Sequence, residues 1–300
     1  MIAWVDPAPG SEAMGDPPDG WTVAPFPDDP AAAPEVGEVE FVVPNWQIAR
    51  GLDPLTGLKV IQTISAGVDW IIDLVPDGVT LCSARGARDP AMAEWVLWAI
   101  LADMKAAGTA AAQQVAHDWE PLDLRDLDGA RVLILGHGSI GAAVEERLVP
   151  FGVEEVVRVA RHARDGVHGV DELAALLPDA DVVVNILPAT AETEGLLGAD
   201  MLRAMRRGAL IVNAGRGSTV DTDALLAALE GGHVRAVLDV VAPEPLPADH
   251  PLWDAPNLIL TPHSAGDTPG AERRSWALAG EQLHRYAAGE PLINVVRDGY

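Results

Sequence analysis

The fold is decided by one stretch of sequence, Arg131-Val132-Leu133-Ile134-Leu135 followed directly by Gly136-His137-Gly138-Ser139-Ile140-Gly141. The first part is an apolar run of strand length, and the second part has the glycine spacing of a tight turn that opens a helix. In such a turn Gly136 makes the bend, Gly138 lets a diphosphate approach the backbone, and Gly141 allows the helix to pack on the strand. Free amides at the helix start bind the diphosphate. The stretch therefore predicts a dinucleotide site formed by Gly136, Gly138, Ser139, Ile140 and Gly141.

Around this stretch, short apolar runs alternate with helical segments, which is typical of a doubly wound parallel sheet. The predicted strands are Arg131–Leu135, Val156–Ala160, Val182–Leu187, Ala209–Asn213, Arg235–Val240 and Leu258–Thr261. Helices are expected in the gaps. One runs from Asp171 to Leu177 and stops at Pro178, and another runs from Thr222 to Glu230 with Asp221 as its cap.

A second, smaller α/β region precedes this one. Its predicted strands are Ile2–Val5, Val39–Val43, Val60–Ser65 and Thr80–Ala84. The segment Pro7–Pro34 contains eight prolines and several acidic residues, so we expect an irregular surface connection and no regular helix. The last predicted helix begins at Thr268-Pro269 and has one apolar stripe, formed by Trp276, Ala279, Leu283, Tyr286 and Ala287.

The position of the glycine-rich turn indicates how the two regions are connected. More than a hundred residues precede the turn, and a helix follows the last predicted strand, so the nucleotide domain is expected as an insertion in the other domain. The predicted fold class is α/β, with two Rossmann-like or flavodoxin-like lobes built on doubly wound parallel sheets. Residues 1–98 and 269–300 are assigned to a substrate-binding domain, and residues 99–268 to the Rossmann domain.

Composition excludes several classes of partner. The formal net charge of −25 argues against nucleic acid and anionic membranes, whose phosphates require the opposite sign. No apolar run has the length of a membrane span, and the N-terminus is unlike a signal peptide, so we expect a cytoplasmic protein. The single cysteine, Cys82, excludes an internal disulfide and a cysteine-based metal site; we expect it to be a buried strand residue, and no metal site is predicted.

Three polar segments follow three predicted strands. They are Asn213-Ala214-Gly215-Arg216-Gly217, Asp239-Val240-Val241-Ala242-Pro243-Glu244 and Thr261-Pro262-His263. Ligands bind at the carboxyl ends of strands in open α/β sheets, so Arg216, Glu244 and His263 are expected to meet at one edge. Reduction of a 2-keto acid needs a cation for the carboxylate and keto oxygen, a proton donor for that oxygen, and a carboxylate that keeps the donor charged. These three residue types meet those needs.

The order and local sequence of these motifs resemble the D-2-hydroxyacid dehydrogenase family, which includes glyoxylate/hydroxypyruvate reductases and phosphoglycerate dehydrogenase. The resemblance covers nearly the whole chain. It implies that Ser65, Ala66 and Gly67 bind the substrate carboxylate through backbone amides, and that Arg216 binds the substrate. It also implies that Glu244 pairs with His263, which gives or takes the proton. The further residues expected at the cofactor are Leu187, Pro188, Thr193, Asn213, Ala214, Gly215, Asp239, His263 and Gly266.

The end of the second strand of the nucleotide domain decides which cofactor is expected. An acidic residue there, about twenty residues after the glycine turn, binds the ribose of NAD, whereas arginine suits the extra phosphate of NADP. Here the strand is followed by Arg161-His162-Ala163-Arg164, and Arg158 precedes them. We therefore predict a preference for NADP(H), carried mainly by Arg161 and secondarily by Arg164, with NAD(H) as the alternative. An exposed basic turn that balances nearby acids is the other interpretation.

Assembly and alternative functions complete the expectations. The helix from Pro90 to about Lys105 places Trp95, Leu97, Trp98, Ile100 and Leu101 on several faces, and the resemblance implies a homodimer through this region. Burial between the two lobes of one chain is the alternative.

Two alternative functions share the fold. One is a cofactor-sensing corepressor without enzymatic activity, and the other is a formate dehydrogenase, which has Gln where Glu244 stands. A structural protein with an empty site would leave the convergence of charged residues unexplained.

Overall fold

The computed structural model describes residues 1–6, 8–45 and 52–297. The chain forms two compact units, a first unit of Met1–Asp89 with Asp267–Tyr300 and an inserted unit of Pro90–Gly266. The first boundary lies at the start of helix α1 (Asp89–Met104), whereas the division expected at residue 98 falls inside this helix. The reason is that Ala93, Val96 and Ile100 of α1 belong to the core of the inserted unit.

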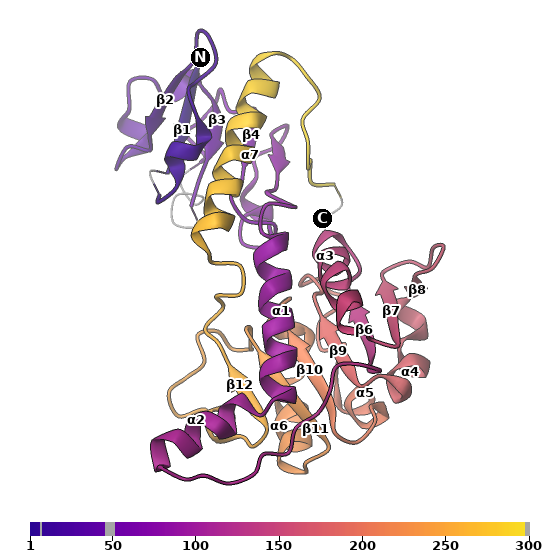
Figure 1. The fold of residues 1–300 in the computed structure, drawn as a ribbon. Coiled ribbons are helices and arrows are strands. Elements are labelled where there is room, and N and C mark those ends of the chain that lie inside the picture. Colours follow the sequence, from indigo (N-terminus) through magenta and orange to yellow (C-terminus); the bar gives the residue numbers. More distant parts are fainter. Residues whose placement is uncertain (7, 46–51, 298–300) are drawn as a thin grey trace. The chain divides into compact units, whose positions relative to one another are not determined.

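The inserted unit is built on a seven-stranded parallel sheet (Figure 1). The strand order is β12-β11-β10-β9-β6-β7-β8, so the order reverses direction between β6 and β9. The strands are β6 (Arg131–Leu135), β7 (Glu155–Ala160), β8 (His168–Gly169), β9 (Val182–Asn185), β10 (Ala209–Asn213), β11 (Val234–Leu238) and β12 (Leu258–Leu260). This is the Rossmann order with one further strand, which confirms the predicted fold class.

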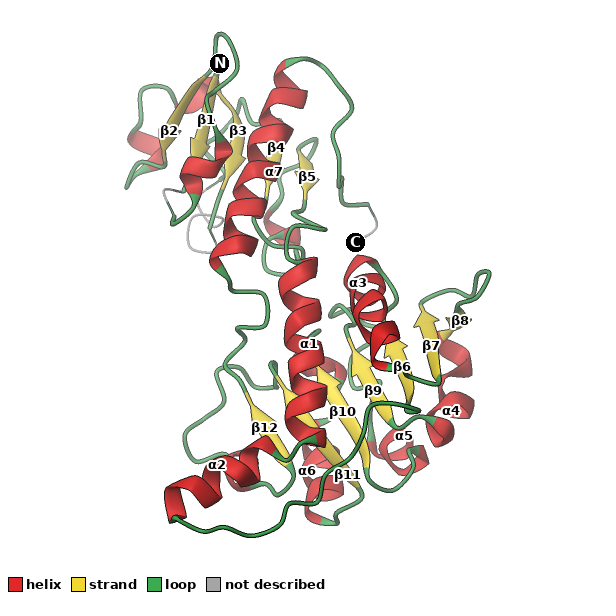
Figure 2. Ribbon diagram, in the orientation of Figure 1, coloured by secondary structure: helices red, strands yellow, loops and turns green. Residues whose placement is uncertain are grey.

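Helices cover both faces of this sheet (Figure 2). Helices α1 and α3 (Ser139–Leu148) pack on one face, and α4 (Leu173–Leu176), α5 (Ala199–Ala204) and α6 (Thr222–Glu230) pack on the other. Side chains alternate between the faces along a strand, so Val132 and Ile134 contact the first group while Leu133 and Leu135 contact the second. Helix α2 (Ala107–Ala116) has no buried residue.

The first unit contains a five-stranded parallel sheet with the order β2-β1-β3-β4-β5, which is the flavodoxin-like order. The strands are β1 (Ile2–Val5), β2 (Thr22–Pro25), β3 (Val39–Val43), β4 (Val60–Gln62) and β5 (Thr80–Cys82). Helix α7 (Pro269–Ala287) begins after the predicted cap Thr268 and buries Trp276, Ala279 and Leu283 against one face. Cys82 is buried on this face, as predicted, and burial raises the pKa of its thiol to about 11.

Several local predictions were wrong. The segment Pro7–Pro34 contains the edge strand β2, and Met14 and Trp21 within it are buried in the core, so it is more than an irregular surface connection. An edge strand tolerates the proline Pro25 because one side of it needs no hydrogen bonds. The helix predicted for Asp171–Leu177 is the single turn α4 between two 3-10 turns. None of the helices in the described part of the chain has the length and hydrophobicity that a membrane crossing requires.

Candidate active site

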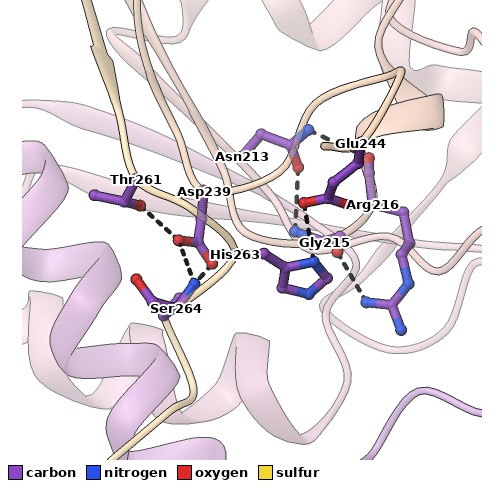
Figure 3. A network of polar contacts seen from close by, with 9 residues as sticks. Asn213, Gly215, Arg216, Asp239, Glu244, Thr261, His263 and Ser264 are labelled. Carbon is purple, nitrogen blue, oxygen red and sulfur yellow. Dashed lines mark hydrogen bonds and ion pairs between the residues drawn. The ribbon is translucent and has the colours of Figure 1, made fainter. Parts of the chain in front are cut away.

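The three predicted catalytic side chains follow three neighbouring strands of the inserted unit. Arg216 comes after β10, Glu244 after β11 and His263 after β12, and these strands are adjacent in the sheet. Their carboxyl ends lie at the same edge, because all three strands run parallel. Figure 3 shows the three side chains in one region of polar contacts. The topology therefore brings together the residues that the sequence predicts as a site.

The imidazole of His263 is paired with the carboxylate of Glu244. The distance between Nδ1 and Oε1 is 3.0 Å, and the side chains are 50% and 36% exposed. With the carboxylate on Nδ1, that nitrogen carries a proton, and Nε2 is the nitrogen that can exchange a proton with a ligand. His263 has a φ of 52°, in the left-handed region that is uncommon for residues other than glycine. Such strained backbone gathers at functional sites, where surrounding contacts hold it in place.

Those surrounding contacts come from Asp239, which is buried at the end of β11. Its Oδ1 accepts hydrogen bonds from the amide of Ser264 (2.9 Å) and the hydroxyl of Thr261 (2.5 Å), and its Oδ2 accepts one from the amide of Ala265 (2.8 Å). The carbonyl of Asp239 also accepts a hydrogen bond from the amide of His263 (2.8 Å). Asp239 thus fixes both sides of the loop that carries the imidazole. Its contact with a cofactor stays a prediction.

A buried amide and hydroxyl network holds the backbone of Arg216. Asn185, at the end of β9, donates from Nδ2 to Thr219 Oγ1 (2.6 Å) and to Asn213 Oδ1 (3.2 Å). Thr219 Oγ1 then donates to the carbonyl of Arg216 (2.6 Å), and Asn213 Nδ2 donates to the same oxygen (3.3 Å). The positioning roles of Asn185 and Thr219 were not predicted from the sequence. The available signal was that two otherwise apolar strands, β9 and β10, each end in asparagine.

The glycine-rich turn between β6 and α3 has the geometry that a dinucleotide needs. Gly136 has a φ of 104°, and a Cβ added there would lie 2.7 Å from the carbonyl oxygen of Ile186, so only glycine fits. Helix α3 begins at Ser139, and no side chain caps its amino end at Gly138. The first amides of the helix are therefore available to an anion, which fits the diphosphate of a nicotinamide dinucleotide.

The arginines in and after β7 differ in what they contact. Arg158 binds Glu145 of α3, with 2.7 Å from Nε to Oε2, and this guanidinium holds the pKa of Glu145 below its usual range. Arg158 lies within β7 and is paired with the largely buried Glu145, so it does not belong to the exposed basic turn with which it was grouped. Arg164 Nη2 donates to the carbonyl of His137 (2.8 Å) in the glycine-rich turn. Arg161 forms an exposed ion pair with Glu192, 3.1 Å from Nη2 to Oε1.

The remaining predicted ligand residues lie in three places. Leu187, Pro188 and Thr193 belong to the loop after β9, where Thr193 Oγ1 donates to the carbonyl of Pro188 (2.6 Å). Ala214 and Gly215 follow β10, and Gly266 is the last residue of the inserted unit. Ser65, Ala66 and Gly67 belong to the first unit, where Ser65 Oγ donates to the carbonyl of Gly67 (2.7 Å). The ligand contacts of all these residues stay predictions.

The chain is similar to several known proteins. The model of the D-isomer specific 2-hydroxyacid dehydrogenase NAD binding domain matches residues 97–265. A formate dehydrogenase of Arabidopsis thaliana is 32% identical over 85% of the chain and 71% of the relative. A glyoxylate reductase of Thermofilum pendens is 34% identical over 81% of the chain and 76% of the relative. The NADPH-dependent glyoxylate/hydroxypyruvate reductase of Sinorhizobium meliloti, solved with NADP and sulfate, has 27% identity and a TM-score of 0.88 over all of both chains.

The buried network predicts the effect of replacing Thr219 by valine. Thr219→Val keeps the shape but leaves the Asn185 amide and the Arg216 carbonyl short of partners, so the free energy of unfolding should fall by about 1–3 kcal/mol. Urea denaturation measures this. Thr219→Ser, which keeps the hydroxyl, should lose less. Thr56→Val, at an exposed position of the first unit, is the control and should change the stability by less than about 0.5 kcal/mol. Equal stability of Thr219→Val and the parent protein would contradict the prediction.

Proposed function

The chain belongs to the D-isomer specific 2-hydroxyacid dehydrogenase family, and on that basis we propose that it reduces a small 2-keto acid of the glyoxylate or hydroxypyruvate type with NADPH. The observation that supports this most is the His263–Glu244 pair, whose members follow β12 and β11, the two strands next in order to β10, which presents Arg216. His263 supplies a proton donor, and the Glu244 carboxylate stabilises its protonated form. Arg216 supplies a cation for an anionic substrate.

The proposed mechanism assigns one task to each side chain. The guanidinium of Arg216 binds the carboxylate and the keto oxygen of the substrate, and it stabilises the negative charge that develops on that oxygen. The imidazolium of His263 donates its Nε2 proton to the same oxygen. When bound, the nicotinamide supplies the hydride that C2 receives. Glu244 stabilises the imidazolium before the transfer, and the exposed ring then regains a proton from solvent.

The Glu244–His263 pair also helps to weigh the two alternative functions, a formate dehydrogenase and a corepressor. A related formate dehydrogenase is among the similar proteins, but an acidic partner at position 244 suits a step in which the histidine must be protonated, because a carboxylate favours the imidazolium. A corepressor would need no turnover. Oxidation of NADPH, followed with glyoxylate, hydroxypyruvate, pyruvate and longer 2-keto acids, decides between these functions. Turnover of formate with none of the keto acids would overturn the proposal.

Replacement of the acid–base pair should affect turnover in a graded way. His263→Ala removes the proton donor, so kcat for keto-acid reduction should fall by about 10²- to 10⁴-fold. Glu244→Gln keeps a hydrogen-bonding partner without the charge, so the loss of kcat should be smaller. His168→Ala is the matched control, since His168 pairs with Glu172 at the same distance of 3.0 Å on β8. Near-normal turnover of His263→Ala would refute the assignment.

The preference for NADPH is proposed to depend on Arg161, with Arg164 in support. Arg161 is an exposed arginine directly after β7, and an arginine fork binds a phosphate well. Arg161→Ala should lower kcat/KM with NADPH by about 10-fold or more and change it little with NADH. Arg203→Ala is the control, because Arg203 is also exposed and paired with an acid, Asp200, in α5. An unchanged ratio between the cofactors would contradict the preference.

The predicted dimer helix differs from the expectation, because Ile100 is buried and Trp95, Leu97 and Leu101 pack against the core of the inserted unit, which leaves Trp98 exposed. A homodimer is therefore proposed on the apolar surface of residues 98–124. Trp98, Val115, Trp119 and Leu124 in this segment are among the exposed large hydrophobic side chains of the described residues, and Trp119 is 99% exposed. A second copy would bury such a surface. Light scattering should give twice the 31.5 kDa of the chain, and Trp98→Glu with Trp119→Glu should yield the monomer. Trp253→Glu, exposed outside this segment, should leave the dimer intact. A monomeric parent protein would refute the proposal.

A further inference from the structure

Arg161 is already engaged by an acid of this chain. Its Nη2 lies 3.1 Å from Oε1 of Glu192, and the two side chains are 63% and 65% exposed. Arg161 follows β7 and Glu192 follows β9, and β6 lies between these strands in the sheet. The ion pair therefore links the loops on both sides of the strand that leads into the glycine-rich turn. An adenosine ribose bound at that turn would lie at the end of β7, next to Arg161.

The loop that carries Glu192 is ordered by its own hydrogen bonds. The amide of Thr190 donates to Thr193 Oγ1 (2.9 Å), and the amide of Thr193 donates to the carbonyl of Thr190 (3.1 Å). Thr193 Oγ1 also bonds to the carbonyl of Pro188. The pKa of Glu192 is lowered, chiefly by a hydrogen bond from the Thr190 side chain and further by its own backbone amide and Arg161. The carboxylate is thus held ionised, in a fixed loop, against Arg161.

We propose that Glu192 is a displaceable counterion of Arg161 and that it sets how strongly the chain selects NADPH over NADH. A 2′-phosphate and the Glu192 carboxylate compete for the same guanidinium, so the phosphate binds to it fully only when the carboxylate is displaced. With NADH there is no phosphate, and Glu192 can accept hydrogen bonds from the ribose hydroxyls. It then takes the part of the acidic residue that other Rossmann domains place at the end of the second strand.

This inference rests on the proposed function, since it needs Arg161 to receive the 2′-phosphate. It goes beyond that function because it assigns the selectivity between NADPH and NADH to Glu192, which lies in the loop after β9. The ion pair is exposed, so its strength is modest and falls with salt. Glu192→Gln should therefore strengthen binding of a 2′-phosphorylated ligand by about fivefold at low ionic strength and by less in high salt. Binding of the ligand without that phosphate should stay equal or weaken.

Isothermal titration calorimetry with 2′,5′-ADP and with ADP tests this without turnover. The proteins to compare are the parent chain, Glu192→Gln, Arg161→Ala and the double variant. Glu194→Gln is the matched control, because Glu194 is an exposed acid of the same loop and the same charge is removed. We expect the gain in 2′,5′-ADP affinity in Glu192→Gln alone. In the Arg161→Ala background the second substitution should have no effect, because the interaction between the two residues is then absent.

The outcomes separate this inference from the cofactor proposal. If Arg161→Ala weakens 2′,5′-ADP but not ADP, and Glu192→Gln changes neither, the cofactor proposal stands and the role of Glu192 is refuted. An equal gain in Glu194→Gln also refutes it, since general charge then explains the effect. If Glu192→Gln still raises the affinity for 2′,5′-ADP in the Arg161→Ala background, the role of Glu192 is also refuted. If Arg161→Ala leaves both affinities unchanged, the phosphate site itself is wrong and both proposals fall.

Discussion

The parallel direction of the strands is the constraint on which the site depends. In the inserted unit, every strand pair runs parallel, so the loops after β6, β7, β9, β10, β11 and β12 all leave the sheet at one edge. Residues separated by a hundred positions, such as Gly136 and His263, therefore belong to the same edge. No single loop carries the chemistry. The order of the strands in the sheet decides which of these loops are neighbours, and so which side chains can act together.

The order of the strands brings the loops together, but it does not orient the side chains within them. Here that task falls to buried polar groups at strand ends, Asn185 beneath Arg216 and Asp239 beside His263. Each is fully hydrogen-bonded to its loop, and a buried polar group without partners would destabilise the fold. The same bonds that satisfy these groups hold Arg216 and the strained backbone of His263 in place. Stability and orientation of the site thus have a common origin.

The features that the sequence predicted are those encoded by local pattern. Apolar runs such as Arg131–Leu135 and caps such as Asp221 and Thr268 need only neighbouring residues, and the structure has them where they were expected. The glycine-rich turn indicated the doubly wound parallel sheet, whereas the order of its strands came from the structure. Strand β2 was missed because its pairing with β1 compensates for a sequence rich in proline. The partners of Arg158 and Arg161 were missed because they come from other elements, and sequence distance gives no sign of them.

Arg158 and Arg161 are three residues apart but have different roles, and the difference lies in how buried their acidic partners are. Glu145, the partner of Arg158, is only 17% exposed and also bonds to His137, so removing Arg158 would leave a largely buried carboxylate with too few partners. Glu192, the partner of Arg161, is 65% exposed, and water can replace the guanidinium when the pair opens. The first pair is therefore part of the fold. The second is open to solvent, and in a chain of net charge −25 it offers the local positive charge to which we propose that a phosphate binds.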